Sequence, residues 1–197
     1  PAPEGVTEAI FARTGTIDRW LTVDTPDVDL DTLGTSDVAG MAVEVIDPVR
    51  DYADLMESLF DFAAIRAAVT EGFTMAFDAM HAVTGPYAHE ILENRLGFPA
   101  GTVHNGTPLE DFGGHHPDPN LVHAKVLYDL MMSADAPPFG AASDGDGDRN
   151  LIIGKHCFVT PSDSLAMLAA NAHLAPAYAG GLKGIARSMP TSAAADR

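Results

Sequence analysis

The spacing of hydrophobic residues changes repeatedly between residues 41 and 159, and these changes predict strands that alternate with helices. Short apolar runs typical of strands occur at 41–46, 73–78, 100–105, 139–143 and 151–159. Apolar residues recur at helical spacing in 48–69, 84–96 and 120–133. The first helix is expected to break near Asp61, and Gly97 is a stop signal after the second. Strands alternating with helices predict a layered α/β domain over residues 41–159.

In the third helix, the apolar residues expected to face the core are Leu121, Val126, Leu127 and Leu130. The segments on either side of the domain have other patterns. An amphipathic helix is predicted over 7–20 and a loop over the polar stretch 22–40. After the domain, we expect a helix that is capped at 161–163 and runs through 173, then a strand over 182–187 and the start of another helix. Because such a short piece cannot bury a core of its own, residues 160–197 are interpreted as the opening of a further domain.

Composition and charge narrow the class of protein. The chain has 197 residues, of which 46% are hydrophobic and 20% charged, as in ordinary soluble globular proteins. A formal net charge of -17 argues against nucleic acid and anionic membranes as partners, because positive charge is needed to neutralise their phosphates. No apolar stretch approaches the roughly 20 residues of a membrane span, and no signal peptide is recognisable. Since residue 1 is not Met, we expect the chain to begin within a longer protein or to have been processed.

The cysteine content indicates the compartment. Cys157 is the single cysteine, so an internal disulfide is impossible and a reducing cytoplasm is favoured. Because Cys157 lies in an apolar segment, its side chain is expected to be buried rather than reactive.

Three aspartates alternate with glycines in the segment DGDGDR at residues 144–149. Alternate side chains of an extended or tightly curled segment point the same way, so Asp144, Asp146 and Asp148 are expected to converge. The intervening glycines let the backbone wrap closely. Three carboxylates this close repel one another unless a cation lies among them. Oxygen-only ligation selects hard cations, and we predict Mg²⁺, with coordination positions left open for water or a phosphate oxygen.

Other interpretations of this loop fit less well. An EF-hand calcium loop starting at Asp144 needs Gly at its sixth position and Glu at its twelfth, where this chain has Arg149 and Lys155. The signature of haloacid-dehalogenase-like phosphatases needs Thr where Asp148 stands, and it follows a more aliphatic strand than FGAAS. A plain acidic hairpin turn stays open as an alternative, although two Asp–Gly pairs, a third Asp and an Arg are less typical of one.

Arg149 has two interpretations that the sequence leaves open. A permanent cation beside a metal site suits a substrate phosphate, which arginine binds through two parallel hydrogen bonds. It equally suits an ion pair with a carboxylate of its own loop.

The His115–His116 pair is not predicted to bind a metal. Adjacent side chains point apart, and no Cys or carboxylate lies at zinc-finger spacing. We interpret the pair as part of the loop structure between Gly114 and Pro117.

Longer segments resemble one enzyme family. DGDGDRNLIIGK, at 144–155, resembles the metal-binding loop of the α-D-phosphohexomutases. The resemblance narrows to the phosphoglucomutases of that family through FDAMHAVTGPY, PLEDFGGHHPDPN, TPSDSLAMLAAN and GLKGIARSMPTSAAADR, which begin at residues 77, 108, 160 and 181. The N-terminal PAPEGVTEAIF resembles the stretch just after the family's active-serine loop. The similarity covers essentially the whole chain.

The resemblance implies a protein of four domains around a central cleft, three of which share a related α/β fold with a mixed sheet. Residues 1–40 would be the helical and acidic tail of domain 1. Residues 41–159 would be domain 2, a three-layer α/β/α domain that carries the metal loop. Residues 160–197 would be the truncated start of domain 3.

The implied reaction interconverts glucose 1-phosphate and glucose 6-phosphate through a phosphoserine and a glucose 1,6-bisphosphate intermediate. Mg²⁺ would be held by Asp144, Asp146 and Asp148 with one phosphoserine oxygen, and Asp148 and Arg149 would contact the hexose phosphate substrate. The family's active serine lies in a Thr-Ala-Ser-His segment that this chain lacks, and 162–164 is interpreted as a helix N-cap instead. The chain alone is therefore predicted to be inactive, with the remaining domains of the same polypeptide as its partners.

Two alternatives belong to other functional classes. The chain could be a non-catalytic divalent-cation-binding module that keeps a mutase-like fold. It could also be an independent phosphatase with Asp144 as its nucleophile.

Overall fold

A computed structural model describes residues 2–197 and divides the chain into two compact units, one up to Asp47 and one from Pro48 onward. The first unit contains helix α1 (Glu4–Thr14) and the strands β1 (Gly34–Val38) and β2 (Met41–Val45). No residue of α1 is buried, and Ile10 is 61% exposed. The helix spans Glu4–Thr14 rather than the predicted 7–20, and the prediction that it is amphipathic is wrong, because its apolar residues form no stripe along one face.

Strand β1 corrects the prediction of a loop throughout 22–40. It pairs with β2 as an antiparallel hairpin in which Val38 lies opposite Met41. Ala39 and Gly40 form the turn with φ of 52° and 87°. Positive φ at both turn residues is the two-residue hairpin geometry that matches the natural twist of paired strands.

The second unit is built on a mixed sheet of five strands in the order β4-β3-β5-β6-β7. Their bounds are β3 Met75–Asp78, β4 Val103–His104, β5 Phe139–Ser143, β6 Asn150–Gly154 and β7 Cys157–Val159. Strands β4 and β5 run parallel to β3 on either side of it, whereas β6 and β7 continue from β5 as antiparallel neighbours. The single strand predicted over 151–159 is thus a hairpin, turned at residues 155–156.

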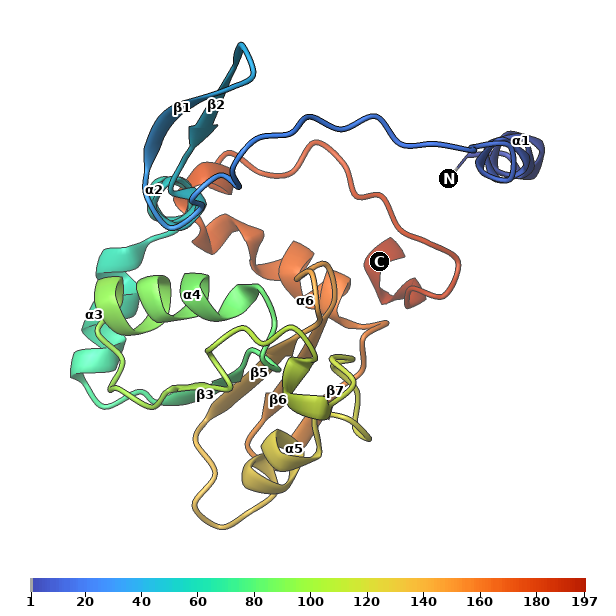
Figure 1. Cartoon of the computed structure of the whole chain (residues 1–197). Coiled ribbons are helices and arrows are strands. Elements are labelled where there is room, and N and C mark those ends of the chain that lie inside the picture. The colour runs from blue at the N-terminus through green and yellow to red at the C-terminus, as the bar shows by residue number, and fades with distance from the viewer. Residues whose placement is uncertain (1) are drawn as a thin grey trace. The chain divides into compact units, whose positions relative to one another are not determined.

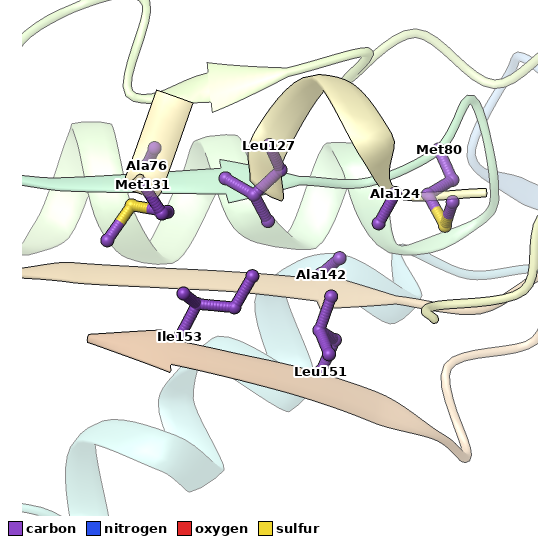
Figure 2. Packing of buried hydrophobic residues seen from close by; sticks show 8 residues of the cluster. All are labelled: Ala76, Met80, Ala124, Leu127, Met131, Ala142, Leu151 and Ile153. Atoms are coloured by element: carbon purple, nitrogen blue, oxygen red, sulfur yellow. The ribbon is translucent and has the colours of Figure 1, made fainter. Parts of the chain in front are cut away.

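Helices cover both faces of this sheet, which confirms the predicted three-layer α/β/α fold (Figure 1). One face packs against α5 (Lys125–Met131), where Met131 and Ile153 are completely buried. Figure 2 shows this core, in which side chains of α5 interlock with small and aliphatic residues of β3, β5 and β6. Close packing of this kind makes the sheet a rigid base for the loops at its edge.

The helices of the opposite face precede and follow β3 in sequence. They are α2 (Pro48–Leu59), α3 (Phe62–Thr70), α4 (Thr84–Ala88) and the π-helical turn η1 (His89–Arg95). The predicted break near Asp61 is confirmed, since the Asp61 carboxylate caps α3 by accepting the Ala64 N–H at 2.9 Å. Gly97 ends η1 with φ of 79°, as a C-terminal stop requires.

Several expectations about packing are wrong. Val126 is 78% exposed and Leu121 is 39% exposed, because α5 begins only at Lys125 and turns Leu127 and Met131 inward. Cys157 is exposed rather than buried, since it opens the edge strand β7. Residues 182–187 form no strand in the part of the chain that the structure describes.

The remaining elements are short. They are η2 (Phe112–Gly114) before α5, and α6 (Ser164–Asn171), η3 (Ala172–Leu174), η4 (Pro176–Tyr178) and η5 (Ala193–Asp196) after β7. Asp163 is the N-cap residue of α6, but its carboxylate accepts the Thr160 hydroxyl instead of a helix N–H. Within residues 2–197, no helix is long and apolar enough to cross a bilayer.

Glu93 of η1 binds the backbone at and just before β4, and we expect this contact to stabilise the fold. Its carboxylate accepts the backbone N–H groups of Gly101 and Val103 at 3.0 and 3.2 Å and lies 2.8 Å from His89 Nδ1. Burial raises the pKa of Glu93, but these bonds outweigh burial and leave the pKa below its ordinary value of 4.5. Glu93→Gln is expected to lower the unfolding free energy by about 1.5 kcal/mol at neutral pH.

The effect of Glu93→Gln depends on pH in a defined direction. A carboxyl whose folded pKa is lowered contributes stability above 4.5 and loses it as the pH falls through the folded pKa. Urea unfolding should therefore give a large gap between wild type and variant at neutral pH and a smaller gap below pH 4.5. A gap of the same size at both values would contradict the ionised role of Glu93.

Candidate metal centre

The topology gathers three loops at one edge of the second unit. Because β3, β4 and β5 are parallel, their carboxyl ends meet at that edge. Ser143, the last residue of β5, shares a hydrogen bond of 2.6 Å with the Thr84 hydroxyl at the start of α4. The segment 144–149, called the Asp loop below, follows Ser143 directly, so the turn after β3 and the loop after β5 are joined where the candidate ligands lie.

The turn after β3 is held in an unusual conformation. Met80 and His81 have φ of 53° and 54°, a region that residues with a Cβ rarely adopt. The buried Asp78 carboxylate holds this turn, since its Oδ1 accepts the Met80 N–H and the Asn105 side-chain amide, both at 2.9 Å. His81 forms a hydrogen bond between its Nδ1 and the Thr107 carbonyl oxygen, 2.8 Å apart. The turn is therefore held in one conformation at the carboxyl end of β3.

The three aspartates of the loop come together as predicted from their spacing. One carboxylate oxygen of each aspartate lies within 4.8 Å of the other two, at the junction of β5 and β6. Asp144 is 1% exposed, whereas Asp146 and Asp148 are open to solvent. Two open ligands beside one buried ligand give a site that a hydrated cation can enter from one side.

Asp144 is fixed before any cation arrives. The backbone N–H of Arg149 donates to Asp144 Oδ1 at 2.9 Å, and the Arg149 Nε donates to Oδ2 at 2.8 Å. Burial raises the pKa of Asp144, but the two bonds from Arg149 outweigh burial and hold the pKa below its ordinary range. The carboxylate is therefore ionised at neutral pH and oriented in the loop.

Asp148 has the opposite electrostatic environment. The negative charge of Asp146, and then the hydrogen bond and charge of Asp144, raise the pKa of Asp148 above its ordinary value. Like charges are thus held close together without full compensation, which a cation would supply. The donor set consists of carboxylate oxygens alone, so it fits Mg²⁺ and other hard divalent cations.

Arg149 contacts carboxylates on two loops. Its Nε donates to Asp144, as described above, and its Nη1 donates to Asp118 Oδ1 at 3.2 Å. Asp148 Oδ1 lies 3.6 Å from the same Nε. Of the two interpretations left open by the sequence, the structure displays the ion pair. The Arg149 side chain is nevertheless 61% exposed, so its remaining N–H groups can bind a phosphate from solvent. Contact of Asp148 and Arg149 with substrate stays a prediction.

The Asp loop is tightly packed at Gly147 and borders a cavity. A Cβ on Gly147, whose φ is 80°, would lie 2.8 Å from the Thr84 methyl group. Next to Gly147 and Asp146 is a mostly apolar cavity of about 560 Å³ between the sheet and α4, with Tyr52 and Tyr87 among its lining residues.

A second group of metal-type ligands lies beside the Asp loop and was missed from the sequence. His116, Asp118 and His123 place one ligand atom each within 4.8 Å of the others. The sequence predicts no metal at the adjacent His115–His116 pair, and His123 was not among the predicted ligands. The signal that could have found it is the Asp118–Asn120 turn between the two histidines.

Residues 50–157 match the family described as phosphoglucomutase/phosphomannomutase, α/β/α domain II. A phosphoglucomutase of Rhizobium radiobacter is 66% identical over 197 residues, which are 100% of this chain and 36% of that protein. A chloroplastic phosphoglucomutase of Marchantia polymorpha is 56% identical over 198 residues, 100% of this chain and 30% of that protein.

A solved structure is similar over the same extent. The open form of the exocytosis-sensitive phosphoprotein pp63/parafusin of Paramecium, a phosphoglucomutase, is 45% identical with a TM-score of 0.87. The similarity covers 100% of this chain and 37% of that one. The chain thus spans about a third of the length of these relatives. It belongs to the phosphoglucomutase/phosphomannomutase family, and residues 50–157 are its α/β/α domain II.

Proposed function

We propose that this chain is the metal-loop segment of a phosphoglucomutase that interconverts glucose 1-phosphate and glucose 6-phosphate through a phosphoserine and a glucose 1,6-bisphosphate intermediate. The observation that carries the proposal is the convergence of Asp144, Asp146 and Asp148 within 4.8 Å at the carboxyl edge of the sheet. Phosphoglucomutases up to 66% identical over the whole chain support the choice of reaction.

The three aspartates are the residues that would hold Mg²⁺. When bound there, Mg²⁺ would offset negative charge on the phosphoryl group during its transfer. Asp144 acts as the fixed ligand, since Arg149 orients both of its oxygens. Asp146 and Asp148 are the exposed ligands, free to adjust to the cation's coordination geometry.

Arg149 is the residue assigned to the substrate phosphate. Its guanidinium stays protonated at every relevant pH, and Asp144 raises its pKa further. The contact of Nη1 with Asp118 would be exchanged for a phosphate oxygen, while Nε keeps its bond to Asp144. Arg149 would then connect substrate to the fixed metal ligand.

The remaining assignments follow the family. Residues 1–40, 41–159 and 160–197 are proposed as the end of domain 1, domain 2 and the start of domain 3. The active serine and the phosphate-binding domain would come from other parts of the same polypeptide. A cytoplasmic location stays our proposal, based on a single cysteine that cannot form an internal disulfide.

The proposal predicts that the 197-residue chain alone has no mutase activity. It lacks the Thr-Ala-Ser-His segment of the family, and the proposed mechanism assigns no other hydroxyl group of this chain to carry the phosphoryl group. A coupled assay that detects glucose 6-phosphate formed from glucose 1-phosphate should show no turnover above background with Mg²⁺ present. Turnover at mutase rates by the purified chain would contradict this assignment.

The complementary experiment uses a longer polypeptide, encoded by the reading frame that contains this segment together with an active-serine loop. It should catalyse the interconversion, and Asp146→Ala in it should remove most of the activity. A longer polypeptide with that serine loop and a bound Mg²⁺ but no turnover would favour the non-catalytic cation-binding module.

A further inference from the structure

We propose that His116, Asp118 and His123 form a second cation site, selective for divalent transition metals of the zinc class and distinct from the Asp loop. The three side chains offer two imidazole nitrogens and one carboxylate oxygen within 4.8 Å of one another. Neither histidine belongs to the proposed phosphoryl-transfer machinery, and Asp118 is linked to it only by its ion pair with Arg149, so the site does not depend on that function.

Local backbone hydrogen bonds bring the two histidines together. The Asp118 N–H donates to the His116 carbonyl at 2.9 Å, and the Asn120 N–H donates to the Asp118 carbonyl at 2.8 Å. The Asn120 side chain then accepts the N–H groups of Val122 and His123 at 2.8 and 3.0 Å. The chain therefore doubles back, and the rings of His116 and His123 lie edge to face with centroids 4.7 Å apart.

The ligands are available and their carboxylate is oriented. In the described part of the chain, the imidazoles of His116 and His123 contact each other and make no side-chain hydrogen bond. A metal would therefore displace no hydrogen-bond partner from their nitrogens. Asp118 Oδ2 accepts the Asn120 side-chain amide at 2.8 Å, which fixes the carboxylate beside the rings. An outer hydrogen bond of this kind is how proteins orient metal-binding groups.

The separation of the ligand atoms is close to what a metal requires. Zinc binds nitrogen and oxygen at about 2.0–2.2 Å, which puts two tetrahedral ligands about 3.4 Å apart. Both histidines are exposed, so small side-chain rotations can reduce the present separation of up to 4.8 Å. Three protein ligands leave at least one position for water.

The donor types set the selectivity. Imidazole nitrogens favour Zn²⁺, Co²⁺, Ni²⁺ and Cu²⁺, whereas Mg²⁺ prefers oxygen and keeps its water. Mg²⁺ should therefore fill the Asp loop and leave the histidine site empty. The two sites are connected by Arg149, which donates to Asp144 in one and to Asp118 in the other. A cation at Asp118 would weaken the Asp118–Arg149 ion pair.

The test is a titration of the 197-residue chain with Co²⁺ in the presence of excess Mg²⁺, followed by displacement with Zn²⁺. Visible absorption typical of nitrogen-ligated Co²⁺ should appear and vanish on addition of Zn²⁺. His116→Gln and His123→Gln should each weaken Zn²⁺ binding by about tenfold or more. His115→Gln is the matched control, because His115 is exposed, adjacent to His116 and outside the ligand group, and it should bind Zn²⁺ as wild type does.

Nuclear magnetic resonance of the wild-type imidazoles gives a second readout that needs no variant to fold. Zn²⁺ should shift the ring signals of His116 and His123 and leave those of His115 and His173 in place. Equal Zn²⁺ affinity in wild type and the His116→Gln/His123→Gln double variant would overturn the site. Loss of Zn²⁺ binding on Asp146→Ala alone would also overturn it, because it would place the zinc in the Asp loop.

Discussion

Gly85→Ala is expected to destabilise the second unit by about 3 kcal/mol, at the upper end of the range for overpacked positions. An added Cβ would lie 1.9 Å from the Gly106 carbonyl oxygen and 2.6 Å from its carbonyl carbon. These are backbone atoms, so no side-chain rotation can relieve the overlap. The chain would have to move α4 away from the loop that follows β4.

A matched control separates this overlap from the general effect of alanine in a helix. Gly5 lies in the first turn of α1, and a Cβ there would meet nothing within 4 Å. Gly5→Ala should therefore leave the urea midpoint unchanged or raise it slightly, since alanine favours helix. Equal midpoints for Gly85→Ala and Gly5→Ala would contradict the close approach of α4 to Gly106.

Asp144→Asn is expected to affect stability and cation binding together. It removes a buried negative charge that accepts two hydrogen bonds from Arg149. Because hydrogen bonds to charged groups are strong, the free energy of unfolding should fall by about 2 kcal/mol. It also removes the one ligand of the loop that is fixed in advance. Urea unfolding should show the stability loss, and calorimetry should show Mg²⁺ affinity reduced by about tenfold or more.

Asp148→Asn is the control for this pair of effects. Asp148 is exposed, and Asp146 and Asp144 raise its pKa by repulsion, so loss of its charge should leave stability unchanged or slightly higher. Mg²⁺ affinity should still fall. A similar loss of stability in Asp144→Asn and Asp148→Asn would mean that the Arg149 bonds do not hold the loop.

The features predicted well from sequence are those set by short-range chemistry. The convergence of Asp144, Asp146 and Asp148 follows from alternate spacing and the glycines between them. The helix break at Asp61 follows from the tendency of aspartate to accept a helix N–H. The alternation of helices and strands between 48 and 143 follows from the side-chain period of each element. The strand at its start, β2, was predicted as part of the same domain but pairs with β1 outside the five-stranded sheet.

The features predicted wrongly depend on partners or on turn geometry. Strand β1 is mostly polar and exposed, and pairing with β2 makes it a strand where its own sequence resembles a loop. The turn between β6 and β7 has no Gly or Pro, and His156 itself adopts a φ of 56°. Nothing in local spacing marks such a turn, so one strand was expected where the chain forms a hairpin.

The grouping of His116 with His123 was missed for a related reason. Residues seven apart come together here through a loop held by the Asn120 side chain, which no helical or strand period describes. The strand expected over 182–187 is absent because its apolar residues find no neighbouring strand in the described chain, and Ile185 is 45% exposed.

The central claim is that the Asp loop binds Mg²⁺, and calorimetry of Asp146→Ala tests it most directly. Asp146 is exposed, so its loss should not disturb the fold. Wild type should bind one Mg²⁺ weakly, with water completing the coordination. Asp146→Ala should bind it at least about tenfold more weakly, a loss of about 1.4 kcal/mol. An unchanged Mg²⁺ affinity in a folded Asp146→Ala variant would contradict the account.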